Sequence, residues 1–283
     1  MGNHIGGERP DATVSQEAGA DGDGAVTVHR DDAVLRLTLD RPSHRNALTQ
    51  LMIRALVDAL TEAAADDSLR AVHLQGAGDD FCAGVDLVGA NSRRRPRTGD
   101  LTRRIPHAAH RVIELVSTIH LPVVCSVQGR AVGFGCNLAL AADFTVAAAD
   151  AVFWEPFVER GFSPDSGSTW LAPRLVGLAR ARRMLLLGEK VSGIDAAEWG
   201  LIHQVVGAPE LSGAAGKLLD RLSHGPTVAI GLAKQALGFG QHATLSQSLN
   251  QELFNLELSC RTDDFKEGME AFRQRRPPEF NGR

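Results

Sequence analysis

The chain has 283 residues, of which 43% are hydrophobic, and a formal net charge of -4 at pH 7. A chain of this length can bury a sizeable core, in one large domain or in one domain with an appendage. Because there is no basic surplus and the arginine patch at 93–97 is short, nucleic acid is not expected as a partner.

The cysteines and the first residues limit the class of protein further. The four cysteines are far apart in the chain, with no CxxC pair and no histidine at metal spacing, so we expect no metal site and no disulfide scaffold. Reduced thiols fit a cytoplasmic protein. Residues 1–24 contain no apolar core of a signal peptide, and no later apolar run is long enough to span a membrane. We therefore expect a disordered leader over 1–24 and no membrane partner.

The first predicted elements are a hairpin and a helix. The runs 25–29 and 33–39 alternate β-branched and polar residues on either side of the polar triplet RDD. The segment 47–66 follows with apolar residues at helical spacing, which predicts an amphipathic helix. Its apolar positions are Leu48, Met52, Leu56, Ala59, Leu60 and Ala63.

Further strands alternate with helices up to about residue 205. The runs 70–76, 122–129 and 142–148 read as strands that end in glycine or small residues, and a helix over 105–119 separates the first two. This alternation predicts an α/β core over 25–205, with ligands bound at the carboxyl ends of its strands.

The remaining chain, 206–283, is predicted to be helical. Apolar residues of its last part cover more than one helix face, which favours contact with a neighbouring subunit as well as with its own core. Burial within one subunit is the alternative. The predicted helices cover 210–223, 226–239 and 243–274, with a break near 261–263; the apolar residues are Leu245, Leu249, Leu253, Phe254, Leu256 and Leu258.

Two glycine-rich turns share one design. GAGDDFCAGVDL (76–87) and QGRAVGFGCNLAL (128–140) each follow a predicted strand, and a helix begins in the second one. Unpaired backbone N–H groups at such turns can form an oxyanion hole for an enolate. Two tight connections without function are the alternative. A dinucleotide fingerprint is a poor fit because Leu138 stands where its third glycine would be.

Six segments together resemble the enoyl-CoA hydratase/isomerase (crotonase) superfamily. The resemblance covers 25–283 in order and implies a spiral α/β core of ββα repeats, a helical C-terminal trimerisation region and an acyl-CoA substrate. It places the thioester oxygen between the N–H groups of Val85, after Ala83 and Gly84, and of Phe134, after Gly133. The segments are LDRPSHRNALT, GAGDDFCAGVDL, QGRAVGFGCNLALAADFTVA, GFSPDSGSTWLAPRLVG, AAEWGLI and FKEGMEAFRQRRPPEFNGR.

This sequence lacks the two acids that the resemblance places in the hydratases of the family. The resemblance places two hydratase glutamates at positions that are Asn137 and Phe157 here. Neither an amide nor a phenyl ring acts as a general base near neutral pH, so ordinary hydration is disfavoured. Isomerase branches carry an acid at the position of Asp165. The segments PDSGSTWLAPRLVG, AAEWGLI and GPTVAIGLAKQAL most resemble the 1,2-epoxyphenylacetyl-CoA isomerase and Δ3,Δ2-enoyl-CoA isomerase types. As an alternative, Asp165 caps a helix over 166–176.

Roles for other polar residues follow from the same resemblance. Arg41, His44 and Arg45 fall where the family approaches the CoA phosphates, which a guanidinium suits. Asn137 is expected to orient a substrate group or water, or else to satisfy backbone groups in its helix. Asp86 is expected to stabilise its turn.

Glu155 and Glu159 are reserve candidates for the acid, and a nucleophilic thiol at Cys82 or Cys136 is the alternative to a packing role. Glu155 and Glu159 are expected on a solvated turn, because Pro156 interrupts the segment between them. Cys82 and Cys136 are read as packing residues rather than nucleophiles, since neither has a paired histidine.

Three functions stay open at this point. The leading one is an acyl-CoA isomerase that uses Asp165 as its acid and base. The others are a hydratase with an atypical site and an acyl-CoA-binding protein without catalysis. In each case no bound cofactor is expected, coenzyme A is part of the substrate, and the assembly is a homotrimer or a dimer of trimers. The loop 88–104 is expected to shape the acyl pocket.

Overall fold

The computed structural model describes residues 24–86 and 98–283. Residues 1–23 of the expected leader and the arginine patch at 93–97 lie outside these ranges, as does most of the loop 88–104. No helix of the described ranges is both long enough and apolar enough to cross a membrane.

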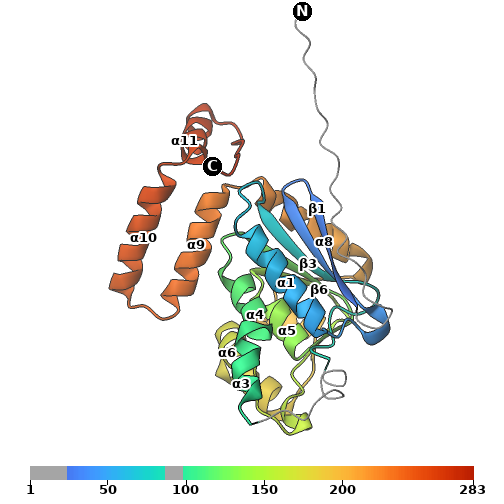
Figure 1. The fold of residues 1–283 in the computed structure, drawn as a ribbon. Helices are drawn as coiled ribbons and strands as arrows, with labels where there is room; N and C mark the ends of the chain where they lie inside the picture. Colours follow the sequence, from blue (N-terminus) through green and yellow to red (C-terminus); the bar gives the residue numbers. More distant parts are fainter. Residues whose placement is uncertain (1–23, 87–97) are drawn as a thin grey trace, which may run out of the picture.

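A six-stranded sheet forms the centre of the fold, with the strand order β1-β2-β3-β4-β6-β9 (Figure 1). The predicted hairpin pairs antiparallel, and every other pairing in this sheet is parallel. The strands of the sheet are β1 (Ala25–Asp31), β2 (Val34–Asp40), β3 (Ala71–Gly76), β4 (Val123–Val127), β6 (Phe144–Ala148) and β9 (Gln204–Val206).

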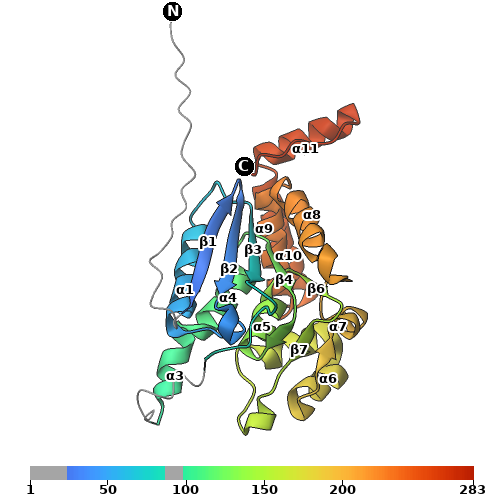
Figure 2. The same ribbon diagram turned by 90° about the vertical axis from the view of Figure 1, so that its right-hand side faces the viewer.

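Helices cover both faces of this sheet. On one face lie α1 (Gln50–Ala63), α4 (Ala109–Thr118) and α5 (Phe134–Ala141), while α8 (Leu211–Ser223) packs on the other against β3, β4 and β6 (Figure 2). The α1 helix begins at the N-cap Thr49, whose hydroxyl accepts a hydrogen bond from the Met52 N–H. The five predicted apolar positions that lie in this helix are buried, so the 3.6-residue period located its core face correctly. The sixth, Leu48, is buried too, but it precedes the helix and forms an isolated bridge with Val85.

A second, three-stranded sheet has the order β5-β7-β8 and was not predicted. Its strands are β5 (Arg130–Val132), β7 (Val152–Trp154) and β8 (Val191–Ser192). These strands are two or three residues long, too short for alternation to reveal them. The sheet matters for the site because β5 leads directly into the second glycine turn.

Helices complete the chain after the strands, close to the predicted bounds. The C-terminal helices are α9 (Thr227–Gly240), α10 (Leu245–Ser259) and α11 (Asp263–Gln274), and α10 packs on α9 away from the sheet (Figure 1). The break between α10 and α11 lies at Cys260–Thr262, where Thr262 caps α11. The other helices are α3 (Asp100–Arg104), α6 (Ser168–Leu187) and α7 (Gly193–Trp199).

Candidate active site

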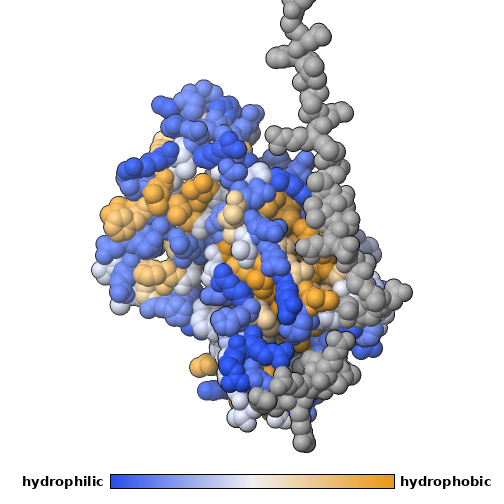
Figure 3. Space-filling model, in the orientation of Figure 1, coloured by the Kyte–Doolittle hydropathy of each residue, from blue (hydrophilic) through white to orange (hydrophobic). Residues whose placement is uncertain are grey.

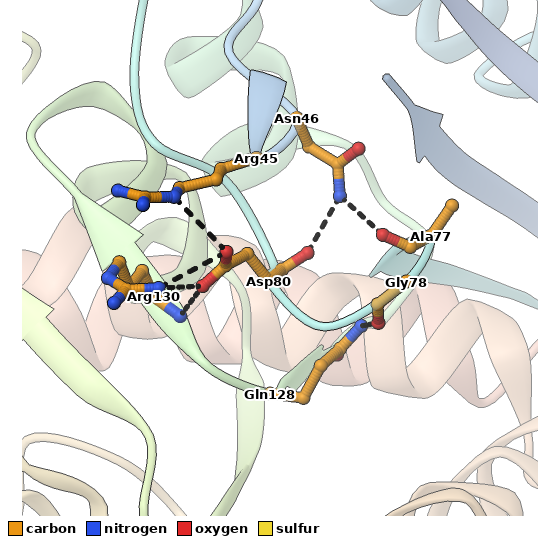
Figure 4. Close-up of polar contacts among 7 residues, drawn as sticks. All are labelled: Arg45, Asn46, Ala77, Gly78, Asp80, Gln128 and Arg130. Atoms are coloured by element: carbon orange, nitrogen blue, oxygen red, sulfur yellow. Dashed lines mark hydrogen bonds and ion pairs between the residues drawn. The ribbon is translucent and has the colours of Figure 1, made fainter. Parts of the chain in front are cut away.

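The first glycine turn, after β3, is held in shape by the carboxylate of Asp80. This carboxylate accepts hydrogen bonds from the backbone N–H of Arg130 at 2.9 Å and from its guanidinium at 3.1 Å. The Arg45 guanidinium lies 3.9 Å away on the other side, and the Asp80 side chain is only 9% exposed (Figure 4). The turn is thereby tied to β5, the strand that precedes the second turn.

Two amide side chains brace the backbone of the same turn. The Asn46 Nδ2 donates to the carbonyl oxygens of Ala77 at 2.8 Å and Asp80 at 2.7 Å, and Gln128 Nε2 donates to Gly78 O at 3.1 Å (Figure 4). Asn46 is fully buried. The sequence analysis missed this role, although Asn46 lies in the quoted segment LDRPSHRNALT.

The second glycine turn joins β5 to α5. Gly133 has φ 54° and ψ -118°, a conformation that a side chain would oppose. Its N–H donates to the carbonyl of Trp154 at 2.8 Å, and Phe134 follows as the first residue of α5. The Phe134 N–H therefore belongs to the positive end of the helix, where N–H groups have no partner within the helix.

The two turns meet through backbone contacts. Cys82 forms an isolated parallel bridge with Ala131, and the Val132 N–H donates to the Cys82 carbonyl at 2.9 Å. A Cβ atom on Gly84 would lie 3.7 Å from the Phe134 nitrogen, which shows how closely the turns approach. Toward other described residues, neither Val85 nor Phe134 donates a hydrogen bond from its N–H. Both N–H groups are therefore available to an oxyanion.

A cavity of about 250 Å³ opens beside these turns. Its wall is largely apolar, and two carboxylates lie in it, Asp100 and Asp165; Asp100 is paired with Arg103 at 2.5 Å. Seven residues predicted for the site line this cavity: Ala83, Gly84, Val85, Gly133, Phe134, Phe157 and Asp165. The part of the predicted acyl loop that the structure describes also contributes, through Asp100, Leu101 and Arg104.

Asp165 faces the cavity from the loop before α6. The hydroxyl of Ser166 donates to its Oδ1 at 2.7 Å, and Phe157 and Phe162 stand in the same wall with ring centroids 5.5 Å apart. The N-cap of α6 is Gly167, and no side chain caps this helix. The alternative reading of Asp165 as a helix cap is therefore wrong.

Asn137 and Glu155 lie behind the cavity rather than in its wall. Asn137 is fully buried and donates from Nδ2 to the Gly133 carbonyl at 3.2 Å, in keeping with the alternative that it satisfies backbone groups. The expectation of a solvated Glu155 is wrong, since it is 1% exposed, whereas Glu159 is exposed as expected. Pro156 and Phe157, which follow Glu155 in the chain, line the cavity, whereas Glu155 does not.

The phosphate-binding prediction concerns residues outside the cavity. The Arg41 guanidinium is 9% exposed, pairs with Asp86 at 2.9 Å and donates to the Ala47 carbonyl at 3.2 Å. A phosphate would have to displace Asp86 to reach it. His44 is exposed, and the Arg45 side chain is 61% exposed, so these two can be reached from solvent. Asp86 takes part in holding its turn, as expected.

The cysteines beside the turns remain neutral thiols. Burial raises the pKa of Cys82 to about 12, and its Sγ contacts the carbonyl of Asn46 at 3.3 Å. Burial likewise raises the pKa of Cys136 well above its usual value. A thiol in such surroundings is a poor nucleophile. The described residues contain no group of three or more His, Cys, Asp or Glu side chains placed to hold a metal ion.

Comparisons with known proteins agree with this architecture. The family model described as Enoyl-CoA hydratase/isomerase matches residues 29–283. The 1,2-epoxyphenylacetyl-CoA isomerase of Escherichia coli is 38% identical over 91% of this chain and 98% of its own length. The 2,3-dehydroadipyl-CoA hydratase of the same organism is 34% identical over 91% of this chain and 99% of its own length.

A solved structure confirms the predicted fold class. The enoyl-CoA hydratase of a Polaromonas species has a TM-score of 0.86 and 32% identity, covering 91% of this chain and all of that one. The fold is thus the crotonase fold, an α/β core with a helical C-terminal region. From the matched family model and these relatives, the chain belongs to the enoyl-CoA hydratase/isomerase family and acts on acyl-CoA thioesters.

Proposed function

We propose that the protein is an acyl-CoA isomerase, which shifts a double bond or opens a ring epoxide by proton transfer through Asp165. The observation that carries the proposal comes from the described residues: one carboxylate without a basic partner, Asp165, lies in the cavity beside two backbone N–H groups that donate to no other described residue. The other carboxylate of the described wall, Asp100, is engaged by Arg103. A single acid that removes a proton and returns it suffices for an isomerisation.

In the proposed reaction the thioester oxygen accepts hydrogen bonds from the N–H groups of Val85 and Phe134. These donors stabilise the dienolate that forms when Asp165 removes the proton at C2, by several kcal/mol. Asp165 then returns the proton at C4, so no water has to be held. The wall of the cavity is largely apolar, with Phe157 buried and Phe162 41% exposed, and Asp165 itself is exposed.

Hydration would need a second acid or base and a place for water. The residue at one hydratase position, Phe157, forms part of the wall beside Gly133. A Cβ atom built on Gly133 would lie 3.9 Å from the Cζ atom of Phe157. The residue at the other position, Asn137, is buried behind that turn. This arrangement favours isomerisation, although a hydratase is among the similar relatives.

The test is ultraviolet absorbance with a 3-enoyl-CoA, in which a rise reports the conjugated 2-enoyl thioester. We expect the wild type to react and Asp165→Asn to lose about 10² to 10⁴ in kcat, the usual value of general acid–base catalysis. Asp150→Asn, at an exposed turn, is the matched control and keeps full activity. Unchanged turnover in Asp165→Asn contradicts the proposal. Loss of absorbance from a 2-enoyl-CoA would indicate a hydratase, and tight binding without turnover a non-catalytic protein.

We also propose that the protein assembles as a homotrimer, or a dimer of trimers, through its C-terminal helices. Apolar side chains gather on the outer surface of α9 and α10 (Figure 3). Leu245 is 76% exposed and Phe254 68% exposed in the single chain, far more than isolated surface residues require. A monomeric mass in solution would contradict this assembly.

A further inference from the structure

Glu155 is a buried carboxyl group that the proposed reaction does not use. It follows β7 directly, between Trp154, whose carbonyl accepts the Gly133 N–H at 2.8 Å, and Pro156, which lines the cavity. The residue is 1% exposed. Neither of its carboxyl oxygens makes a hydrogen bond of acceptable geometry to another described residue, although Cys136 and Asn137 lie beside them. A buried polar group without partners is costly, so this one requires an explanation.

The groups that face Glu155 come from two other elements. Cys136 and Asn137 of α5 adjoin its carboxyl, and the charge of Asp165 acts on it from the loop before α6. None of these described neighbours is a cation. An ionised Glu155 would therefore be a buried negative charge acted on by the charge of the exposed Asp165, with only a thiol and an amide to stabilise it.

Asn137 has a side-chain oxygen that lacks a hydrogen-bond donor among the described residues. Its Nδ2 is used by the Gly133 carbonyl at 3.2 Å, but its Oδ1 is buried without a partner among the described residues. An amide oxygen and a carboxylate oxygen are both acceptors, so they cannot satisfy one another. One proton on the carboxyl group would supply a donor to the amide oxygen. Burial also raises the pKa of Glu155 well above its usual value, as such a proton requires.

We propose that Glu155 keeps its proton in the folded protein and donates it in a hydrogen bond to the Asn137 Oδ1. Glu155 is then a positioning residue, because Asn137 in turn holds the Gly133 carbonyl at the turn that presents the Phe134 N–H. The catalytic part of this inference rests on the proposed function, whereas the protonation of Glu155 does not.

The protonation is tested by unfolding in urea between pH 5 and pH 8, with Glu155→Gln and the exposed control Glu159→Gln. The unfolded chain loses its carboxyl protons near pH 4.3 to 4.5, whereas the folded protein keeps the proton of Glu155. Raising the pH therefore favours unfolding of the wild type. Its unfolding constant should rise relative to that of Glu155→Gln by up to about tenfold per pH unit until the folded pKa is reached.

The proposal is overturned if the ratio of the wild-type unfolding constant to that of Glu155→Gln does not change with pH. It is also overturned if the ratio of the wild-type constant to that of Glu159→Gln changes with pH to the same extent. A carboxylic-acid carbonyl band in the infrared spectrum of the wild type, lost in Glu155→Gln, is the second measurement. Neither depends on turnover, so both remain decisive if the proposed function fails.

The positioning role is tested by rescue. Glu155→Met fills the space without a donor and is expected to lower kcat about tenfold with little change in KM. Glu155→Gln offers an N–H to the Asn137 Oδ1 and is expected to keep kcat within about threefold. If both variants lose kcat equally, the hydrogen bond to Asn137 has no positioning role and the proposal is wrong.

Discussion

Replacing Gly135 with alanine tests whether the approach of the two turns sets the rate. A Cβ atom at this position would lie 2.4 Å from the Cys82 carbonyl oxygen, 2.7 Å from its Cβ and 2.9 Å from its Sγ. Ordinary contact begins at 3.4 Å, so the turns must separate by about 1 Å. Cys82 is two residues before Gly84, and Gly135 follows Phe134, so this displacement changes the spacing of the two N–H donors.

We expect Gly135→Ala to lower kcat about 100-fold with a much smaller change in KM, since a misplacement of 1 Å can cost this much. The clash costs about 1–3 kcal/mol of stability, against about 1 kcal/mol gained from helix propensity, so the variant still folds. The assay is the absorbance rise with a 3-enoyl-CoA, alongside urea unfolding.

Gly216→Ala in α8 is the matched control, because a Cβ atom there meets nothing within 4 Å. It should raise the free energy of unfolding by about 1 kcal/mol and leave kcat unchanged. A Gly135→Ala variant with wild-type kcat would refute the reasoning that the spacing of the turns governs the reaction.

Two further predictions concern stability. Burial lowers the pKa of His73 to about 4, and its Nδ1 accepts from Arg36 at 3.0 Å while Nε2 lies 2.7 Å from the Ser126 hydroxyl. The unfolded chain binds this proton near pH 6.5, whereas the folded protein binds it only near pH 4. The free energy of unfolding of the wild type should therefore fall by up to about 3 kcal/mol between pH 6.5 and 4. Acid unfolding of His73→Gln should not show this fall. Lys234→Met should lower the free energy of unfolding in urea by about 2 kcal/mol, because the ammonium group pairs with Asp143 at 2.7 Å and connects α9 to the core. A variant as stable as the wild type would contradict this prediction.

Periodicity and glycine position were sufficient to predict most of the fold. The buried face of α1 follows from its 3.6-residue period, and the predicted break near 261–263 agrees with the N-cap Thr262 of α11. The small sheet could not be predicted, because its strands are two or three residues long and depend on contacts with distant segments. Local pattern carries no information about such pairing.

The parts of the candidate site that consist of backbone turns could be predicted from the sequence. The features that depend on which side chains are buried could not. Glycines at Gly84 and Gly133 mark the turns in the sequence itself. The burial of Glu155 depends on how α5 packs against the segment after β7, which no local signal reveals. The pairing of Arg41 with Asp86 joins residues 45 positions apart, so a surface arginine and a paired one look alike in sequence.

In the proposed active site, the bridge between Cys82 and Ala131 makes the two oxyanion donors part of the protein's framework. Main-chain atoms form that half of the machinery, so side chains at Val85 and Phe134 can vary in identity without removing it. The acid, by contrast, is a single exchangeable side chain on a separate loop. Moving a carboxylate from one loop to another would convert such an enzyme between reaction types while the electrostatic support for the enolate stays in place.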